Sequence, residues 1–434
     1  MRVLKAAKIL FAIVLAALFF SSCASFAQQT AQHRRSMERG AYDAALAELE
    51  ANPVINNNKN RVLFLLDKAT ALHLAGRAEE SNKYFELAER QADAYWATSI
   101  TEEAASLVTS DDIMAYPGED FERAMIPIYR AMNYLILNDL EAALVECRRV
   151  DIKLNEINSR YKTANVYRED AFARWMTGII YEAAGDINNA LVAYRRAIAV
   201  YEKDYAPNYR LKTPKRLIED YLRALKEMDF QDELSQAAAK YPFALSRAVP
   251  LEADMGEIVL IHQNGRSPHK TEGFVVVPID NTVVKVAFPL YNPTPYRVSG
   301  AIVRAGEAKA VTEKAQNITE IAIKNLKDRS GRWVTKTAAR AALKFGAKKL
   351  ADKANPLLGL AVNVANVATE KADTRSWLTL PAEFNIARLP LKAGVYTVSL
   401  QYLGGGMESI YGETLPDVKV EAGKKLFIIR RTWH

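Results

Sequence analysis

The stretch AFARWMTGIIYEAAGDINNALVAYRRAIAVYEKD, from Ala171 to Asp204, decides the fold of the N-terminal half of this chain. Apolar residues recur at helical spacing on both sides of Gly185 and Asp186, a pair typical of a tight turn. Two helices joined by a short turn are therefore predicted. Small residues would let the helices approach, and aromatic rings would fill the groove between them. The predicted packing positions are Gly178, Tyr181, Gly185, Ala190, Tyr194 and Ala197.

This pattern resembles the tetratricopeptide repeat (TPR), a helical hairpin of about 34 residues. The usual closing proline is absent, and Trp175 stands one position late. Similar but weaker units surround the turns Gly76-Arg77 and Asn138-Asp139, and a partial unit begins at Gly40. Repetition at consistent offsets predicts a TPR-like α-solenoid over residues 36–245, with an unrelated helical bundle as the alternative.

From about Glu257 the hydrophobic period changes to two, which indicates strands. The predicted class is thus α + β multidomain, with a mainly β, immunoglobulin-like sandwich over residues 250–434. An open sheet is the alternative. A largely helical insert, about 313–370, interrupts the strands. The strands are expected at Glu257–His262, Gly273–Ile279, Val283–Leu290, Tyr296–Arg304, Glu383–Leu389, Gly394–Leu403, Asp417–Glu421 and Lys425–Thr432.

The insert is rich in lysine and arginine, and a cation recurs every four residues along part of it. We consider two roles for this segment. It forms a basic amphipathic arm that lies on anionic lipid or a partner, or it packs on the sandwich with its lysines in water. Residues 354–369, which follow, are uncharged but too few and too polar to span a bilayer. The candidate residues for an anionic surface are Arg332, Lys336, Arg340, Lys344 and Lys348.

The N-terminus has the pattern of a secretory signal, predicted over residues 1–22, with three basic residues before an apolar run. Ser21-Ser22-Cys23 resembles a lipobox, which predicts acylation of Cys23 and a short tether over residues 23–35. Ser25-Phe26-Ala27 is the alternative processing site and would release a soluble periplasmic protein. Ala24 and Ser25, with no Asp after the cysteine, resemble the signal for outer-membrane retention. We therefore expect a lipoprotein on the periplasmic face of a bacterial outer membrane.

Charge is distributed unevenly along the chain. Residues 23–240 carry 28 basic and 34 acidic side chains (net −6), whereas residues 241–434 carry 27 and 17 (net +10). Nucleic acid is a poor partner for an exported protein, and an anionic membrane surface or an acidic protein fits the basic half better. Besides Cys23 the chain has only Cys147, so we expect neither a disulfide nor a Cys-ligated zinc, and Cys147 is predicted to be buried.

Residues that could carry chemistry are sparse, and we predict no catalytic, cofactor-binding or metal-binding residue and no cofactor. The five histidines are scattered without metal-ligand spacing, and His262 and His269 are predicted to be surface residues beside a turn. Glu119, Asp120 and Glu122 follow the break at Pro117-Gly118. They are predicted to cap a helix, with cation binding as the alternative. Arg375 and Trp377 are expected to form an interdomain contact.

Taken whole, the chain is similar to an uncharacterised family of bacterial exported lipoproteins. The phrases that carry the resemblance are YPGEDFERAMIPIYRAMNYL (116–135), EAALVECRR (141–149), GEIVLIHQNGRSPHK (256–270) and ADTRSWLTLP (372–381). Relatives of this kind are often encoded beside lipoproteins that resemble activators of penicillin-binding proteins, which implies a role in the cell envelope. The resemblance brings no catalytic residues.

These observations predict a non-enzymatic, lipid-anchored scaffold whose TPR-like domain binds another protein. The expected role is in assembly of the envelope or of the peptidoglycan machinery. A membrane-surface-binding or remodelling component that acts through the basic insert is the alternative. An envelope hydrolase or transferase is the third hypothesis, and it requires a deep pocket lined by converging polar groups.

Overall fold

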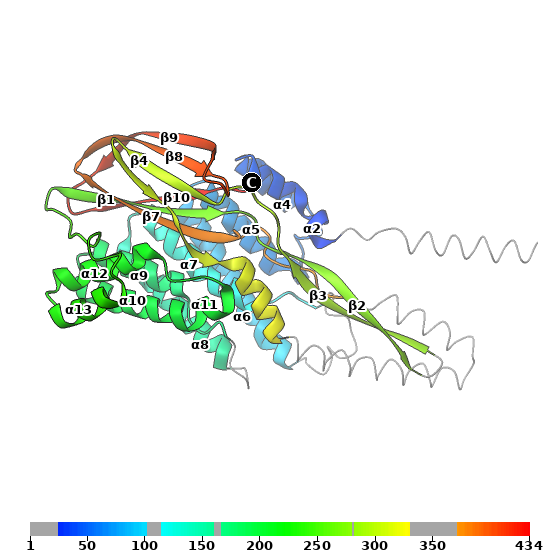
Figure 1. Cartoon of the computed structure of the whole chain (residues 1–434). Helices are drawn as coiled ribbons and strands as arrows, with labels where there is room; N and C mark the ends of the chain where they lie inside the picture. Colours follow the sequence, from blue (N-terminus) through cyan, green and yellow to red (C-terminus); the bar gives the residue numbers. More distant parts are fainter. Residues whose placement is uncertain (1–24, 102–113, 160–165, 280–281, 330–370) are drawn as a thin grey trace, which may run out of the picture.

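The computed structural model describes residues 25–101, 114–159, 166–279, 282–329 and 371–434. A helical half is followed by a β-rich half, which confirms the predicted α + β class (Figure 1). The helices are α2 (Phe26–Gln29), α3 (Ala31–Glu38), α4 (Tyr42–Ala51), η1 (Asn58–Asn60), α5 (Arg61–Leu74), α6 (Ala78–Thr101), α7 (Asp120–Ile136), α8 (Leu140–Ser159), α9 (Ala171–Ala183), α10 (Ile187–Val200), η4 (Tyr201–Tyr205), α11 (Ala206–Tyr209), α12 (Lys215–Glu227) and α13 (Gln231–Lys240).

The helices pair into successive hairpins, α3/α4, α5/α6, α7/α8, α9/α10 and α12/α13. Each of the five turns contains a residue with a positive φ, between 55° and 80°. A residue in this left-handed conformation is the usual way to end a helix, and glycine or asparagine adopts it at least cost. The same device repeated five times is what gives the helical half its TPR-like character. The residues are Gly40, Gly76, Asn138, Gly185 and Asp229.

In the α9/α10 hairpin, Gly178 lies directly against the ring of Tyr194. A Cβ atom on Gly178 would collide with that ring, so the absence of a side chain permits the close approach. Asp186 is the N-cap residue of α10, and its carboxylate accepts a hydrogen bond from the Asn189 amide at 3.0 Å. Of the other predicted packing residues, Ala190 and Ala197 are fully buried with Tyr194, and Tyr181 is half-buried.

The β-rich half contains two four-stranded sheets and a separate two-stranded hairpin. One sheet has the order β10-β1-β7-β6 and the other β5-β4-β8-β9, while β2 pairs with β3 and with no other strand of the described residues. In the first sheet β1 runs parallel to β10 and antiparallel to β7. The strands are β1 (Met255–Asn264), β2 (His269–Ile279), β3 (Thr282–Asn292), β4 (Gly300–Ala305), β5 (Ala308–Val311), β6 (Glu313–Asn317), β7 (Glu383–Lys392), β8 (Gly394–Leu403), β9 (Ser409–Val420) and β10 (Lys425–Arg431).

The two four-stranded sheets pack face to face and form a sandwich. Leu260 on β1 and Leu389 on β7 share a buried cluster with Val303 on β4 and Leu400 on β8. The opposite face of the first sheet belongs to a different core. Val259 and its neighbours on that face are buried together with residues of the helical half. Alternate residues of β1 therefore serve two cores, and this explains why the four consecutive residues 258–261 are all apolar.

Several details differ from the sequence-based expectations; the strand expected at Asp417–Glu421, for example, is β9 and begins at Ser409. The predicted tether is helical from Phe26, and His33 of α3 is buried against Asp67, 3.1 Å away. The predicted helical insert begins as strand β6, because Glu313–Asn317 pairs with β7; residues 318–329 are then helical. The first two predicted strands belong to different sheets, since β1 and β2 are not paired. The signal, Cys23 and the basic residues from Arg332 to Lys348 lie outside the described residues.

Candidate functional site

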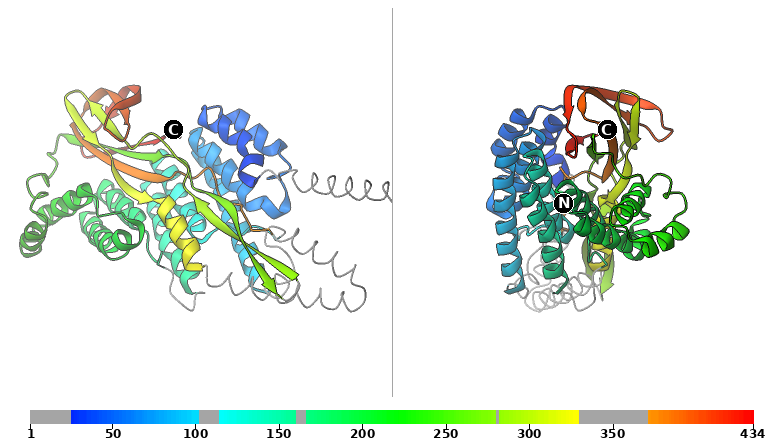
Figure 2. Two further views of the ribbon diagram at one scale, coloured as in Figure 1. Left: turned by 45° about the vertical axis from the view of Figure 1, so that its right-hand side comes forward. Right: turned by 90° about the vertical axis from the view of Figure 1, so that its left-hand side faces the viewer.

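The first sheet covers the inner face of the helical array. The first helices of the last four hairpins supply side chains to this contact, namely α5, α7, α9 and α12. Tyr129 of α7 lies 5.4 Å, ring to ring, from Trp377, and Phe172 of α9 stacks on Phe384 of β7 at 4.9 Å. All four rings are fully buried. Figure 2 shows the strands lying along the helices in two further views. The face that a TPR array commonly leaves open is thus filled by the chain's own sheet.

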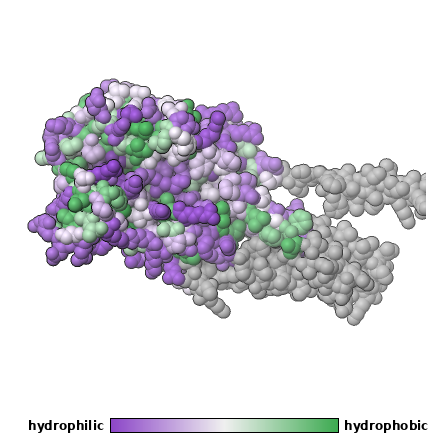
Figure 3. All heavy atoms as spheres, in the orientation of Figure 1, coloured by the Kyte–Doolittle hydropathy of each residue, from purple (hydrophilic) through white to green (hydrophobic). Residues whose placement is uncertain are grey.

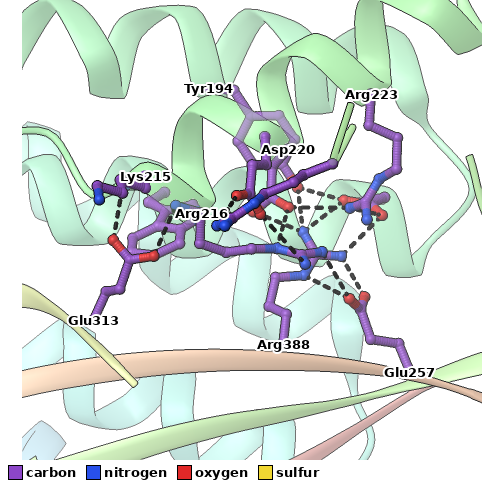
Figure 4. Close-up of polar contacts among 12 residues, drawn as sticks. Tyr194, Lys215, Arg216, Asp220, Arg223, Glu257, Glu313 and Arg388 are labelled. Carbon is purple, nitrogen blue, oxygen red and sulfur yellow. Dashed lines mark hydrogen bonds and ion pairs between the residues drawn. The ribbon is translucent and has the colours of Figure 1, made fainter. Parts of the chain in front are cut away.

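A cluster of charged side chains is buried within this contact (Figure 4). The Arg388 guanidinium of β7 is at its centre, fully buried, with carboxylates from both halves around it. It donates to Glu182 of α9 at 2.9 and 3.0 Å and to Glu257 of β1 at 3.0 Å, and it lies 2.9 Å from Asp220 of α12. Lys425 of β10 bridges Glu182 and Glu257 at 2.9 and 2.8 Å.

Further donors surround the same carboxylates. Arg223 donates to Glu182 at 2.7 Å, and Arg216 donates to Asp220 at 2.9 Å. The Trp175 indole N–H also donates to Asp220, at 3.0 Å. The unusual position of this tryptophan within the repeat is therefore accounted for by a specific buried hydrogen bond. Every carboxylate of the cluster has at least two partners.

Electrostatics keep Glu182 and Glu257 ionised. Burial alone would raise the pKa of Glu182, but the positive charges of Arg388, Arg223 and Lys425 outweigh burial and hold that pKa well below its usual range. The pKa of Glu257 is lowered by the same opposition, with Arg388 as its strongest counter-charge. Groups that neither titrate near neutral pH nor reach solvent are unsuited to acid–base catalysis. The ion pairs of the cluster join the first sheet to helices α9 and α12.

A chain of hydrogen bonds runs through the same contact beside the charged cluster. The Tyr129 hydroxyl donates to the Gln263 side chain of β1 at 3.0 Å, and the amide nitrogen of Gln263 lies 2.7 Å from Nε2 of His73. Nδ1 of His73 lies 2.6 Å from Oδ1 of Asn133. This arrangement assigns the proton to Nδ1 and leaves Nε2 as the acceptor. Burial lowers the pKa of His73 to about 4, so the ring is neutral.

A second buried polar cluster lies where β2 and β3 leave the helical half. Glu122 accepts hydrogen bonds from the Tyr116 hydroxyl at 2.7 Å, the Glu119 amide at 3.0 Å and the Trp377 amide at 2.6 Å. Burial raises the pKa of Glu122 to about 7. The ammonium group of Lys270 contacts Glu119. Glu122 therefore caps the start of α7, as predicted. The carboxylate of Glu119, which was the alternative metal-ion ligand, is paired with Lys270 and Arg329.

The structure also locates the other residues that were considered from the sequence. Cys147 is buried, and burial raises its pKa to about 12. Arg375 donates to Asn60 at 3.1 Å, and the indole of Trp377 donates to Thr70 at 3.2 Å, so both contact the helical half. His262 is fully buried, which makes its prediction as a surface residue wrong. In the described ranges no group of three or more His, Cys, Asp or Glu side chains could hold a metal ion, and no helix is long and apolar enough to cross a membrane.

The outer face of the array is formed by the second helices of the hairpins. Large apolar side chains are exposed there on three successive ones, Leu87 on α6, Ile152 on α8 and Val192 on α10. Single exposed apolar residues are common on soluble proteins. These three matter because they lie on the face of the array that the sheet does not cover.

The charged cluster was not predicted. Glu257 and Arg388 each interrupt an otherwise apolar strand, in GEIVLI and NIARLPL, and this was the available signal. An ionised side chain in a strand buried on both faces needs a partner. Which partner it has depends on the docking of the sheet, and periodicity says nothing about that docking.

No protein-family model and no curated protein matches the sequence. Solved structures that resemble it are repeat proteins. The match to MamA spans 50% of this chain and 95% of the MamA chain, at 14% identity and a TM-score of 0.31. A chain from Podosopora anserina with nearly identical TPR-like repeats covers 50% and 94%, at 15% identity and a TM-score of 0.32. A tetratricopeptide repeat protein from Parabacteroides merdae covers 52% and 81%, at 15% identity and a TM-score of 0.21. Likeness at this level carries no argument about function.

Proposed function

We propose that this protein is a non-enzymatic interaction scaffold that binds another protein through its TPR-like domain. The observation that carries the proposal is the filled inner face, because it leaves the outer helices as the surface that the TPR-like array presents to a partner. Stacked helical hairpins present extended surfaces of this kind. The buried charged cluster is consistent with this conclusion, since its carboxylates are paired with arginine and lysine side chains of the same chain.

We further propose that the scaffold is attached to the bacterial cell envelope by acylation of Cys23, at the outer membrane. The support comes from the sequence: a short apolar run, a lipobox-like Ser-Ser-Cys and the absence of Asp after the cysteine. Several acyl chains on one residue give stable attachment, whereas a single chain binds only marginally. Mass spectrometry of the mature N-terminus tests this directly. An unmodified chain that begins after Ala27 would overturn it.

The partner surface is tested by site-specific photo-crosslinking in envelope preparations. We place the crosslinking amino acid at Leu87, Ile152 or Val192, and at Val395 of β8, an equally exposed apolar residue of the sandwich, as the control. We expect one discrete product from the outer-helix positions and none from Val395. The product should disappear when Ile152 is replaced by Glu, a change that leaves folding intact because the side chain is exposed. Identical products from all positions, or none, would contradict the proposal.

A further inference from the structure

Strand β9 is the outermost strand of the second sheet, and one of its edges meets no other strand of the described residues. It is twelve residues long, whereas the outermost strands β5, β6 and β10 have four, five and seven residues. β6 is also covered by the helical half, since the Tyr201 hydroxyl donates to the backbone carbonyl of Ala315 at 2.5 Å. A long open edge carries a row of unpaired backbone N–H and C=O groups, and these can pair with another chain.

The two halves of β9 differ in how well they are protected from such pairing. In the C-terminal half, Pro416 has no N–H and Asp417 has a φ of 53°, and the register with β8 shifts at these two residues. Proline, charge and irregular backbone are the usual protection of an edge strand. Residues 409–415, SIYGETL, contain no proline and a single charge, that of Glu413. The N-terminal half is therefore the part of the edge that is open to another strand.

Side chains on the inner face of the sheet hold this segment in place. Tyr411 packs on Tyr402 of β8, with the ring centroids 4.7 Å apart. Glu413 accepts hydrogen bonds from the Tyr402 hydroxyl and from Nε of Arg430 on β10, the latter at 3.1 Å. The charge of Glu413 is thus matched within the chain, and the segment is ordered while its edge stays open. The exposed residues of the segment are Ser409, Ile410, Tyr411, Gly412 and Thr414.

The segment is complementary to itself about Gly412. If two copies pair antiparallel with Gly412 on the two-fold axis, Ile410 of each copy lies opposite Thr414 of the other, and Tyr411 lies opposite Glu413. The first pair joins two β-branched side chains, and the second joins a hydroxyl to a carboxylate. No two like charges are directly opposite each other. A two-fold contact uses the same surface on both copies and requires this kind of self-complementarity.

Figure 3 shows mostly pale and purple residues along the rim of the sandwich at which Figure 1 labels β9. This edge therefore offers no broad apolar patch, and pairing would depend on backbone hydrogen bonds. Seven residues of strand extend over about 23 Å, so the contact is small. Small contacts are typical of weak complexes, and the association should depend on protein concentration.

We propose that two copies of this chain associate through residues 409–415 of β9, which pair antiparallel about Gly412. The second sheets of the two sandwiches would then form one continuous sheet across the two-fold axis. This surface lies on the sandwich and not on the outer helices of the array. The proposal depends neither on the partner surface of those helices nor on acylation of Cys23.

The register is tested with paired cysteines on the full mature chain that carries Cys23→Ser. Ile410→Cys with Thr414→Cys would place thiols of the two copies opposite each other, within the Cα separation of about 4.4–6.8 Å that a disulfide requires. Either substitution alone leaves the two thiols offset by four residues, about 13 Å along the strands, which is too far. Mild oxidation should therefore link the double variant into a dimer and leave both single variants unlinked. Cys147, the other cysteine, is buried.

The matched control is Ser409→Cys with Thr414→Cys, which has the same number of exposed thiols on opposite faces of the strand. It should not form the linked dimer. Equal linking of this control and of the Ile410–Thr414 variant would show that the disulfides come from random collision, and it would overturn the proposed register. Absence of linking in both would overturn the pairing itself.

The association is measured without cysteines by sedimentation equilibrium between about 1 μM and about 300 μM. The Cys23→Ser chain should shift toward dimer as its concentration rises. Ile410→Lys with Thr414→Lys should raise the dissociation constant by about tenfold or more, because like charges would lie directly opposite each other. Val249→Lys with Val395→Lys adds the same charge at sites that are 61% and 64% exposed elsewhere, and it should have no effect. A chain that stays monomeric, or equal dissociation constants for the two lysine variants, would overturn the proposal.

Discussion

Arg388, on strand β7, donates two hydrogen bonds to Glu182, on helix α9, although the two residues are 206 positions apart. The Arg388 side chain is fully buried and the Glu182 side chain is 9% exposed. A buried ion pair is weak support for high stability, because desolvation of both charges opposes their attraction. Removing one member is a different matter, since the remaining charges stay buried without their counter-ion. The pair therefore specifies how the sheet docks on the array, and its loss is expected to be costly.

Replacement of Arg388 by Met tests how much these buried ion pairs contribute to stability. Three carboxylates would lose their central cation, and the free energy of unfolding should fall by about 3–5 kcal/mol. Urea denaturation followed by circular dichroism measures the change. The control is Lys392→Met on the same strand, where an exposed lysine lies 3.4 Å from an exposed Asp254. That change should stay within about 0.5 kcal/mol of the wild type. Equal midpoints for the two variants would show that the cluster does not hold the halves together.

The buried histidine makes stability depend on pH. The pKa of His73 is about 4 in the folded protein, below the ordinary value of 6.5, so the unfolded chain binds a proton that the folded chain does not. Stability from this group is present above pH 6.5 and is lost as the pH falls toward 4. Between pH 7 and pH 5 the loss should be about 2 kcal/mol.

The measurement compares wild type with His73→Gln at the two pH values. Gln can still donate to Asn133 and accept from Gln263, so the hydrogen-bond chain survives while the titration is removed. The pH-dependent part of the unfolding free energy should therefore be smaller in the variant. Glu122, whose raised pKa acts in the opposite direction over this range, is common to both proteins and cancels in the difference. An identical pH dependence in the two proteins would show that His73 titrates normally.

The thiol of Cys147 should be unreactive in the folded protein. Burial raises its pKa to about 12, so the reactive thiolate is nearly absent at neutral pH, and the side chain does not reach solvent. In the Cys23→Ser chain Cys147 is the only cysteine. A chromogenic disulfide reagent should react with it in urea but hardly at all without urea. Ser235→Cys, at an exposed position of α13, supplies the reactive control. Rapid modification without urea would indicate that α7 and α8 open easily.

Local features of this fold could be predicted from the sequence because they depend on residues close together in the chain. The turn at Gly185 and the approach of Gly178 to Tyr194 follow from repeat spacing alone. Strand β8, Gly394–Leu403, was predicted with the observed bounds because its alternation is regular. The β-sandwich also followed from the number and spacing of strands.

Long-range relationships could not be predicted in this way. Nothing in the period of β1 or β10 indicates that they run parallel side by side, because Asn264 and Lys425 are 161 positions apart. Residues 23–35 were predicted to be a tether because they are polar, but from Phe26 they are helical. His33 can be buried there because Asp67, distant in sequence, lies opposite it. The filling of the inner face is the largest consequence. It depends on which surface the sheet covers, and a single sequence does not encode that in any local pattern.

Replacement of Gly178 by Ala tests the packing on which the α9/α10 hairpin depends. Alanine normally favours a helix over glycine by about 1 kcal/mol. Here the added Cβ would collide with the ring of Tyr194, which cannot move freely because its hydroxyl donates to Glu182 at 2.5 Å. The free energy of unfolding should therefore fall by about 1–3 kcal/mol. In a Tyr194→Leu background the same change should be neutral or stabilising, since the ring is gone. Additive effects of the two substitutions would show that the collision is relieved elsewhere, and that Gly178 is not required for the approach of the two helices.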